Sequence, residues 1–456
     1  MAKRFVIIGG GPAGNQAATH AARLGAHVTL IEKDIVGGAA HLWDCIPSKA
    51  MIATGGALSM INQAKGMGLS DVSATLDFDA LRERIAGIED RLQGSVTQLL
   101  KSQDVTIIEG TGRLTGPHTV VADTADGPIE LEADVIVLST GSRPRIPDWA
   151  PIDGRRVLTT RDAYPPPELP THLIVIGAGV TGVEFVHMFS AFGCQVTFIV
   201  SRQQVLPQKD AEVAAALEED FLGRGVRLFK GARAERIEVS ADGDDAGVAV
   251  FCDDGRVARG SHALMAIGSI PNSEDLGLEA AGVETEWGYV KVDHNCLSSV
   301  KHIYAAGDLS GKLPLSSVAS MQGRKIAEHA MGLHVGPHRH LDYEKAASAI
   351  FTVPEIADVG LAEADAFSDG RKIRVTKVPF SASAKALIEN DPRGFVKIIS
   401  DPATGVVLGG SIVGRHAAEL ISVIALAVTA GLKVNDIVES LLVHPALAEA
   451  LADAAE

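Results

Sequence analysis

The sequence contains little cysteine, few aromatic residues and a deficit of basic charge. Only 4 of its 456 residues are Cys, and 4% are Phe, Trp or Tyr. Four scattered cysteines do not make the disulfide framework of a small secreted domain, and no Cys-x-x-Cys spacing indicates a zinc site. The net charge of −16 disfavours binding to nucleic acid and to anionic membrane surfaces. We expect no metal site and no nucleic-acid partner.

Long hydrophobic runs are also missing. The apolar residues 5–8 are too few for a signal peptide and are followed by three glycines. The apolar stretch 420–432 is interrupted by Ser422, Thr429 and Gly431, and it is shorter than the ~20 residues that span a bilayer. These features predict a cytoplasmic protein without integral membrane association.

Glycine, in contrast, is abundant, with 47 residues, and it marks a repeated pattern. Residues 5–8 and 173–176 each predict a short strand, and each is followed by Gly-x-Gly-x-x-Gly, a helical segment and a second strand. The motif glycines are Gly9, Gly11 and Gly14 in the first copy, and Gly177, Gly179 and Gly182 in the second. In this βαβ context the first glycine makes the turn, the second admits a pyrophosphate and the third lets the helix pack on the strand. The helix N-terminus then faces the phosphates. We therefore predict two dinucleotide sites.

Several residues around the first copy complete a predicted adenosine site. Glu32 lies eighteen residues past Gly14 at the end of the second strand, where a carboxylate accepts both ribose hydroxyls. Two further turns close apolar strands and are expected to approach the same cofactor. The residues assigned to this site besides the motif glycines are Pro12, Ala13, Glu32, Lys33, Thr140, Gly141, Gly307 and Asp308.

The second copy lacks this carboxylate. We align Ser201 with Glu32, and Arg202 follows it. An arginine there pairs with a 2′-phosphate, which favours NADP and leaves NAD possible. The alternative is an exposed loop arginine without a ligand.

Other parts of the chain carry clearer structural than chemical signals. Apolar residues at steps of three and four predict a helix over 78–101. Residues 395–399 and 406–409 predict a hairpin, and 416–430 and 434–442 predict helices. The length suggests about three domains.

Taken together, the motifs resemble the flavoprotein disulfide reductase family, which includes dihydrolipoyl dehydrogenase, glutathione reductase and mercuric reductase. The resemblance covers essentially the whole chain. Besides the two glycine motifs it rests on Cys45-Ile46-Pro47-Ser48-Lys49, Thr140-Gly141-Ser142, Val183-Glu184, Tyr304-Ala305-Ala306-Gly307-Asp308, Pro354-Glu355 and His444-Pro445 with Glu449.

The resemblance implies an α/β fold with two Rossmann-like dinucleotide-binding domains and a C-terminal α+β dimerisation domain. It implies FAD in the first nucleotide domain (1–150), NAD(P)H in the second (151–272), a central segment completing the FAD site (273–340) and a homodimer interface (341–456). The second nucleotide site then includes Gly268. The catalytic residues implied are Cys45, Lys49, Glu184, His444 and Glu449.

One departure from the family is decisive. The family's redox motif has two cysteines five residues apart, but this chain has Ala40 in place of the first, which is the thiol that attacks the substrate. Disulfide exchange needs an attacking thiolate and a second thiol to resolve the mixed disulfide. The pattern is most similar to a dihydrolipoyl dehydrogenase-like branch of NAD(P)H:quinone reductases that lacks the redox disulfide. His444 departs from that branch, in which we expect the histidine to be lost.

These features predict an enzyme that passes electrons from NAD(P)H through flavin to a quinone-like acceptor. Lys49, paired with Glu184, would lie beside the flavin, and His444 from the partner protomer would protonate the reduced acceptor. His41, Leu42 and Trp43 would shape an apolar acceptor pocket, or Trp43 merely fills space.

Three alternatives remain open from the sequence. Cys45 alone could cycle with peroxide or through a mixed disulfide. The chain could also be a soluble transhydrogenase between the two pyridine nucleotides. A non-enzymatic, flavin-binding redox sensor is the third.

Overall fold

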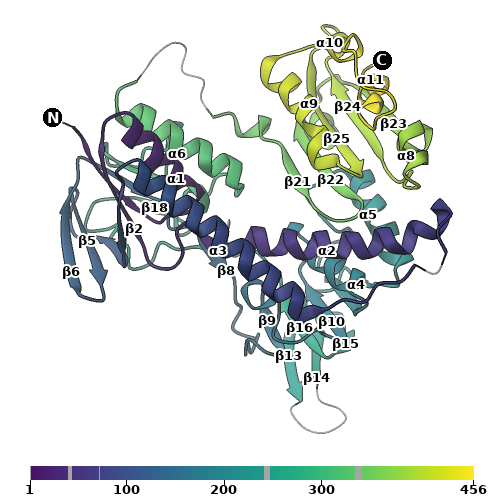
Figure 1. Cartoon of the computed structure of the whole chain (residues 1–456), viewed down its shortest axis with the longest axis horizontal. Coiled ribbons are helices and arrows are strands. Elements are labelled where there is room, and N and C mark those ends of the chain that lie inside the picture. The colour runs from purple at the N-terminus through teal and green to yellow at the C-terminus, as the bar shows by residue number, and fades with distance from the viewer. Residues whose placement is uncertain (1, 40–43, 71, 241–246, 334–340) are drawn as a thin grey trace. The chain divides into compact units, whose positions relative to one another are not determined.

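The computed structural model describes residues 2–39, 44–70, 72–240, 247–333 and 341–456. The contacts within the chain divide it into two compact units, and each unit is built from three separate segments of the sequence. Unit 1 comprises 1–48, 79–145 and 269–343, and unit 2 comprises 49–78, 146–268 and 344–456. The predicted α/β fold is confirmed (Figure 1). The functional boundaries at 150, 272 and 340 stay a prediction.

Unit 1 is built on a five-stranded parallel sheet in the order β20-β7-β1-β2-β3. These strands are β1 (Arg4–Ile8), β2 (His27–Glu32), β3 (Thr106–Glu109), β7 (Val135–Leu138) and β20 (Ile303–Ala305). A separate antiparallel sheet holds β4 (Thr111–Leu114), β5 (Thr119–Thr124) and β6 (Gly127–Glu132). Two short pairs complete the unit: β8 (Ser142–Pro144) with β17 (Ser269–Pro271), and β18 (Thr285–Glu286) with β19 (Tyr289–Val290).

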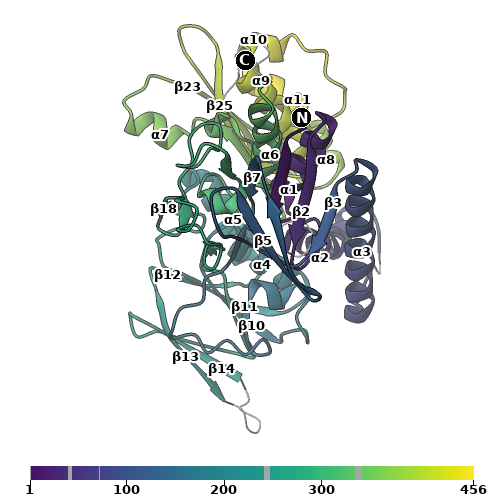
Figure 2. The ribbon, with the colours of Figure 1, turned by 90° about the vertical axis from the view of Figure 1, so that its left-hand side faces the viewer.

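Small residues allow two helices to pack closely on one face of this sheet. Helices α1 (Pro12–Arg23) and α6 (Ser316–Ala330) lie side by side (Figure 1). A Cβ on Gly323 of α6 would come within 2.1 Å of the Ala13 carbonyl oxygen of α1. The core beneath them contains Phe5, Ile7 and Leu30. Helix α3 (Phe78–Ser102), predicted at 78–101, packs against the same core through Leu100 and runs beside β3 (Figure 2).

Unit 2 repeats the same sheet in the order β12-β11-β10-β16-β9, again all parallel. Its strands are β9 (Val157–Thr159), β10 (His172–Ile176), β11 (Gln195–Val200), β12 (Arg227–Lys230) and β16 (His262–Met265). Helices α4 (Val180–Ala191) and α5 (Ala211–Gly223) also belong to this unit, as does α2 (Ile46–Gln63) from Lys49 onward. An antiparallel sheet of β13 (Ala234–Ser240), β14 (Gly247–Cys252) and β15 (Val257–Gly260) adjoins β10.

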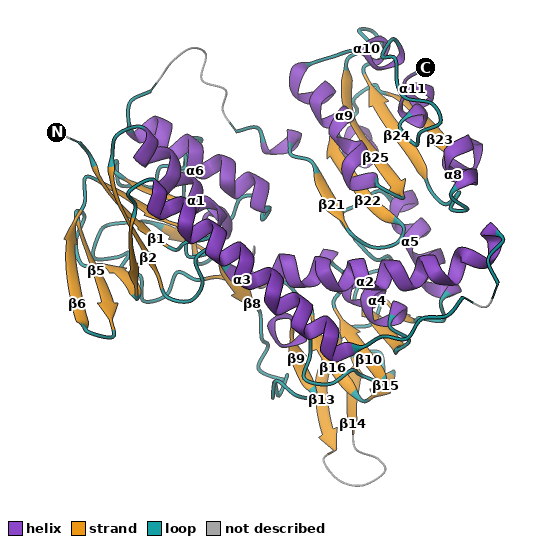
Figure 3. Ribbon diagram, in the orientation of Figure 1, coloured by secondary structure: helices purple, strands orange, loops and turns teal. Residues whose placement is uncertain are grey.

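The C-terminal part of unit 2 is an antiparallel sheet covered by helices (Figure 3). Its order is β21-β22-β25-β24-β23, and α9 (Ala417–Ala430) packs on β22 and β25. The strands are β21 (Ser348–Ile350), β22 (Glu355–Gly360), β23 (Arg374–Pro379), β24 (Phe395–Ser400) and β25 (Val407–Gly414). The remaining helices are α7 (Glu363–Ser368), α8 (Ala384–Ile388), α10 (Val434–Val438) and α11 (Glu449–Ala455). The predicted hairpin is β24–β25, and α10 ends four residues before the predicted 442.

Candidate functional site

The first glycine motif links β1 to α1 in the geometry expected of a phosphate turn. Gly9 has φ +101°, and a Cβ there would lie 2.3 Å from the Ser139 carbonyl oxygen. A Cβ on Gly14 would lie 2.0 Å from the Gly9 carbonyl oxygen, so only glycine fits. At Gly11 the nearest heavy atom would be 3.9 Å away, which leaves room for a ligand. Pro12 and Ala13 begin the helix.

The second motif, between β10 and α4, has nearly the same dimensions. Gly177 has φ +110° and would place a Cβ 2.3 Å from the Ala266 carbonyl oxygen. A Cβ on Gly182 would lie 1.8 Å from the Gly177 carbonyl oxygen, and one on Gly179 would meet nothing within 4 Å.

Both helix starts suit a pyrophosphate. Among the described residues, no side chain caps the N-terminus of α1 or of α4, and neither first turn holds an acidic residue. Unpaired N–H groups and the positive end of the helix dipole therefore face the open second glycine, which is the arrangement that binds phosphate groups. The residues present fit two dinucleotides.

Glu32 is the last residue of β2, as its predicted role requires. Its Oε2 accepts a hydrogen bond from the Gly10 N–H (2.6 Å), and its Oε1 accepts one from the Asp34 N–H (2.8 Å). The carboxylate is thus fixed beside the first glycine turn. Lys33 follows on the surface and lies 3.9 Å from Asp34.

The end of the second strand differs in unit 2, and the register corrects our alignment by one residue. Ile8 pairs with Ile31 before Glu32, and Ile176 pairs with Ile199 before Val200. Val200, and not Ser201, is therefore the positional equivalent of Glu32. Ser201 and Arg202 follow β11 and are exposed. The absence of a carboxylate at this strand end is unaffected.

The turns after β7 and β16 also correspond. Gly141 (φ +70°) and Gly268 (φ +95°) each lie three residues past the strand, and a Cβ on either would meet nothing within 4 Å. Thr140 Oγ1 donates a hydrogen bond to the Asn272 carbonyl oxygen (2.7 Å) in unit 1.

The Gly307–Asp308 turn follows β20 and is held from two sides. The Ser142 hydroxyl donates to Asp308 Oδ2 (2.6 Å). The Gly307 N–H donates to Oε1 of the buried Gln322 (2.7 Å), whose amide in turn donates to the Tyr343 hydroxyl (2.9 Å). The side chain of Asp308 is thereby oriented within unit 1.

Lys49 and Glu184 are brought together from distant parts of the sequence. Lys49 lies in the first turns of α2, and its ammonium is 2.8 Å from Glu184 Oε2 and 3.1 Å from Oε1. The Glu184 side chain on α4 is only 4% exposed, against 32% for Lys49. Glu184 Oε1 also accepts the Phe351 N–H (3.1 Å), and the Phe351 ring centre is 5.0 Å from the Lys49 ammonium.

Cys45 directly precedes α2 and is partly exposed, whereas the other three cysteines are buried thiols. Burial raises the pKa of Cys194 and of Cys296 to about 12 and that of Cys252 to about 11. These three remain protonated near neutral pH and are poor nucleophiles. Ala40, His41, Leu42 and Trp43 lie outside the described residues.

His444 and Glu449 form a hydrogen-bonded pair at the C-terminal end of unit 2. His444 Nδ1 lies 2.7 Å from Glu449 Oε1, and the imidazole is 74% exposed. The Ala446 N–H donates to Glu449 Oε2 and, together with His444, lowers the pKa of this carboxyl. Oriented in this way, the exposed imidazole is able to act on another molecule.

Ser142, Gln322 and Phe351 were not predicted as site residues, although Ser142 ends the Thr140-Gly141-Ser142 motif. Each contacts a predicted residue that is 15 to 167 positions away, so no local pattern reveals the contact. The rule that buried polar groups are paired would have singled out Gln322 only after its burial was known.

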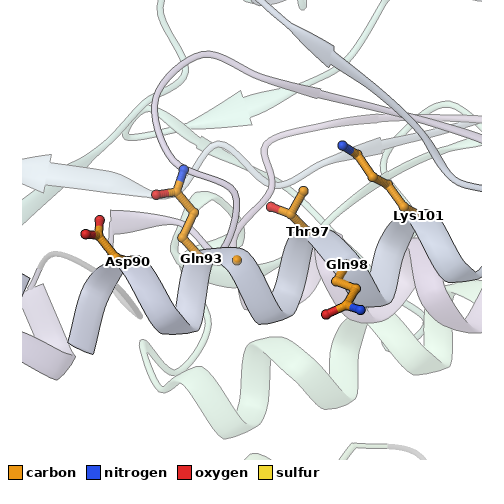
Figure 4. A pocket seen from close by; sticks show the side chains of 6 residues that line it. Asp90, Gln93, Thr97, Gln98 and Lys101 are labelled. Atoms are coloured by element: carbon orange, nitrogen blue, oxygen red, sulfur yellow. The ribbon is translucent and has the colours of Figure 1, made fainter. Parts of the chain in front are cut away.

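An open hollow on α3 is lined by Asp90, Gln93, Gly94, Thr97, Gln98 and Lys101, none of them a predicted site residue (Figure 4). Among the described residues, His, Cys, Asp and Glu form no group of three suited to a metal ion. Within the same ranges, no helix has the length and apolar character needed to cross a membrane.

Comparison with known proteins agrees with this geometry. Residues 3–323 match the family model described as pyridine nucleotide-disulphide oxidoreductase, and residues 346–455 match the dimerisation domain of the same family. Enzymes of this family use FAD and NAD(P)H.

Two relatives illustrate the range of the family. An NAD(P)H dehydrogenase (quinone) of Mycobacterium tuberculosis is 42% identical over 100% of this chain and 94% of its own length. A dihydrolipoyl dehydrogenase of Zymomonas mobilis is 34% identical over 99% and 97%.

Solved structures show the same fold. The crystal structure of LpdA from M. tuberculosis superposes with a TM-score of 0.93, at 42% identity and with coverage of 100% and 99% of the two chains. The HOCl-induced flavoprotein disulfide reductase RclA from Escherichia coli gives 0.87 at 26% identity, with 99% of each chain covered. The chain belongs to the pyridine nucleotide-disulphide oxidoreductase family of flavoenzymes.

Proposed function

We propose that this chain is an FAD-dependent NAD(P)H dehydrogenase that passes electrons to a quinone or a similar diffusible acceptor without a redox-active disulfide. The observation that carries the proposal is Ala40 in place of the first cysteine of the redox motif, with Cys45 as the remaining sulfur. Exchange with a disulfide requires two thiols at the site. The name of the 42% identical mycobacterial relative, NAD(P)H dehydrogenase (quinone), supports the same acceptor class.

The other cysteines are unsuited to replace the missing thiol. Cys194, Cys252 and Cys296 are buried in hydrophobic surroundings, and burial raises the pKa of each thiol. A thiol that stays protonated does not attack a disulfide at a useful rate.

The overall reaction converts NAD(P)H, one proton and a quinone into NAD(P)⁺ and a hydroquinone. Bound FAD would supply the two-electron step, accepting a hydride from the nicotinamide and returning two electrons to the acceptor. The glycine turn at Gly9–Gly14, Glu32, Thr140–Gly141 and Gly307–Asp308 would hold FAD. The second turn, at Gly177–Gly182, and Gly268 would hold NAD(P)H.

Lys49 and Glu184 would provide the fixed charge beside the reacting ring. The ammonium is held by a carboxylate that is itself almost fully buried, so its position is fixed before the reaction begins. A preorganised cation stabilises negative charge that develops in the transition state without reorientation.

His444 and Glu449 would supply a proton in a homodimer. The imidazole is exposed on its own protomer and oriented by Glu449, which suits donation into a site on the partner protomer. A quinone that takes two electrons also takes two protons, and an imidazole near neutral pH is an effective donor.

Arg202 would favour NADPH over NADH. It follows β11, and none of the hydrogen bonds or ion pairs of the described residues engages its guanidinium. Val200 offers no carboxylate to repel a 2′-phosphate.

The variant Cys45→Ser tests the proposal. Steady-state oxidation of NADPH with menadione is expected to stay within about twofold of the parent, because electrons pass by direct contact. Loss of menadione turnover in a variant that still holds FAD would contradict it and favour a reaction through Cys45 with peroxide or a small thiol.

A further inference from the structure

Arg224 joins three segments of unit 2. It follows α5, its side chain is 20% exposed, and its guanidinium makes three different contacts. Nε lies 2.7 Å from Asp220 Oδ2, Nη1 lies 3.0 Å from His187 Nδ1, and Nη2 donates to the Val353 carbonyl oxygen. A planar guanidinium with five fixed donors suits such a junction, and an ammonium does not.

His187 is the acceptor that connects Arg224 to α4. It is fully buried and lies one helical turn after Glu184 on the same helix. Burial, together with the nearby Arg224 and Arg393, lowers the pKa of His187 to about 3. The imidazole is therefore neutral at working pH, and its Nδ1 accepts a hydrogen bond from the guanidinium.

Val353 connects the same guanidinium to the segment that touches the Lys49–Glu184 pair. Two residues before it, the Phe351 N–H donates to Glu184 Oε1, and the Phe351 ring lies under the Lys49 ammonium. Glu184 is thus linked to Arg224 in two ways. One link runs along α4 through His187, and the other runs through the backbone of residues 351–353.

We propose that Arg224 is a positioning residue for the Lys49–Glu184 pair, because it holds the Phe351 amide against the Glu184 carboxylate. A carboxylate that is 4% exposed has few other donors, so loss of this amide leaves Lys49 as its main partner. The inference rests on the role given to Lys49 and Glu184 in the proposed function.

The variant Arg224→Lys tests whether Arg224 holds the Phe351 amide against Glu184. The variant keeps the charge, but an ammonium cannot hold the ion pair with Asp220 and direct hydrogen bonds to both His187 and Val353. In the FAD-loaded protein we expect hydrogen exchange at the Phe351 amide to become at least tenfold faster. The rate of flavin reduction at saturating NADPH should fall roughly tenfold, as expected when a hydrogen bond to a charged group is lost. The Kd of NADPH should not change.

Arg393→Lys is the matched control. Arg393 belongs to the same ion cluster, since its Nη1 lies 2.7 Å from Asp220 Oδ1, but its guanidinium contacts Asp220 and Asp391 and not the Val353 carbonyl oxygen. We expect a similar fall in Tm with no change in amide exchange or reduction rate. Two outcomes would show that Arg224 has only a structural role. One is that Arg224→Lys and Arg393→Lys slow flavin reduction equally. The other is that Arg224→Lys lowers Tm without changing the rate of flavin reduction or hydrogen exchange at the Phe351 amide.

A second pair of variants keeps the test open if Arg224→Lys does not fold. In His187→Asn the side-chain oxygen replaces the Nδ1 acceptor, and the reduction rate should be preserved. In His187→Leu the acceptor is lost, and slowing should match that of Arg224→Lys; the reverse order would overturn the proposal. If Lys49→Met leaves the rate of flavin reduction unchanged, the Lys49–Glu184 pair does not have the role given to it in the proposed function. Hydrogen exchange at the Phe351 amide still shows whether Arg224 holds that amide in place.

Discussion

The two nucleotide-binding sheets of this chain have the same design with different endings. The strand order β20-β7-β1-β2-β3 corresponds position by position to β9-β16-β10-β11-β12, and the glycines that link the central strands to α1 and α4 correspond as well. In both, a Cβ on the third motif glycine would lie within 2.0 Å of a carbonyl oxygen, and one on the second would meet no heavy atom closer than 3.9 Å. The glycine turn therefore has nearly the same geometry in both sheets.

The differences lie where each strand meets the ligand. β2 ends in Glu32, and β11 ends in Val200, which is followed by Ser201 and Arg202. The fifth strand of the first sheet leads into Gly307–Asp308, whereas that of the second, β9, leads into a short 3-10 helix at Thr160–Ala163. On the proposed function, the first sheet thus offers two carboxylates, Glu32 and Asp308, to the hydroxyls of FAD, and the second offers the cation of Arg202 to a 2′-phosphate. We infer that the first holds its nucleotide tightly and the second exchanges it.

The largest expected effect comes from the third glycines. Gly14→Ala places a methyl group against the Gly9 carbonyl oxygen, and Gly182→Ala places one against Gly177. Overpacking of this kind costs about 1–3 kcal/mol and displaces the turn. Gly14→Ala should be purified without FAD, while Gly182→Ala should remain yellow and lose reduction by NADPH. Absorption at 450 nm and stopped-flow reduction distinguish the two.

The control for both is Gly94→Ala. A Cβ on Gly94 in α3 meets nothing within 4 Å. The Gly94→Ala variant should therefore keep its FAD, be reduced by NADPH at the parent rate and have a slightly higher Tm. Loss of FAD from Gly182→Ala would show that the two sheets do not act separately.

The sequence was sufficient to predict the glycine turns and the first strands around them, because their signals are local. It could not predict that β20 and β9 complete the sheets, since β20 lies 165 residues after β7, and β9 lies about 100 residues before β16. The sequence alone led us to align Ser201, instead of Val200, with Glu32, because only the pairing of Ile176 with Ile199 fixes the register of the two strands. Phe351 was missed because its contribution is a backbone N–H, which no residue type marks.

Glu32→Gln tests the strand end of the first sheet. The substitution replaces a charged carboxylate, which accepts hydrogen bonds from the Gly10 and Asp34 N–H groups, with a neutral amide. The proposed hydrogen bonds from the ribose hydroxyls are weakened in the same way. The Kd of FAD should rise roughly tenfold to hundredfold, as expected for weakened hydrogen bonds to a charged group. Fluorescence titration of the apoprotein measures it, and an unchanged Kd would remove Glu32 from the site.

Arg202→Ala tests the strand end of the second sheet. KM for NADPH should rise roughly tenfold, with KM for NADH unchanged, because the charge-assisted bonds to the 2′-phosphate are lost. Arg155→Ala removes the same charge from another exposed position of unit 2 and should change neither value. Equal effects on both nucleotides would contradict a role in phosphate recognition.

The smallest effect concerns the opposite end of the sheets. The first N–H of β1 donates to Asp134 (2.8 Å), whereas the first N–H of β10 donates to the Ser261 hydroxyl (3.1 Å). Hydrogen bonds from Arg4 lower the pKa of Asp134 to about 2. Since the folded pKa is below the unfolded one, this stabilisation is present above about pH 4 and is lost as pH falls towards 2.

The pair is exposed, so the difference in Tm between the parent and Asp134→Asn should be small. It should be constant from pH 7 to 5 and shrink below pH 4. Ser261→Ala should show no such pH dependence. A difference that persists at pH 2 would contradict the ion pair at Asp134.

The missing thiol is tested most directly by reoxidation of the reduced flavin. The protein is reduced anaerobically with one equivalent of NADPH and mixed in a stopped-flow instrument with menadione, lipoamide, glutathione disulfide or hydrogen peroxide. With Ala40 in the redox motif, we predict rapid return of the 450 nm absorption with menadione and no return with either disulfide. Rapid reoxidation by lipoamide or glutathione disulfide would contradict the account.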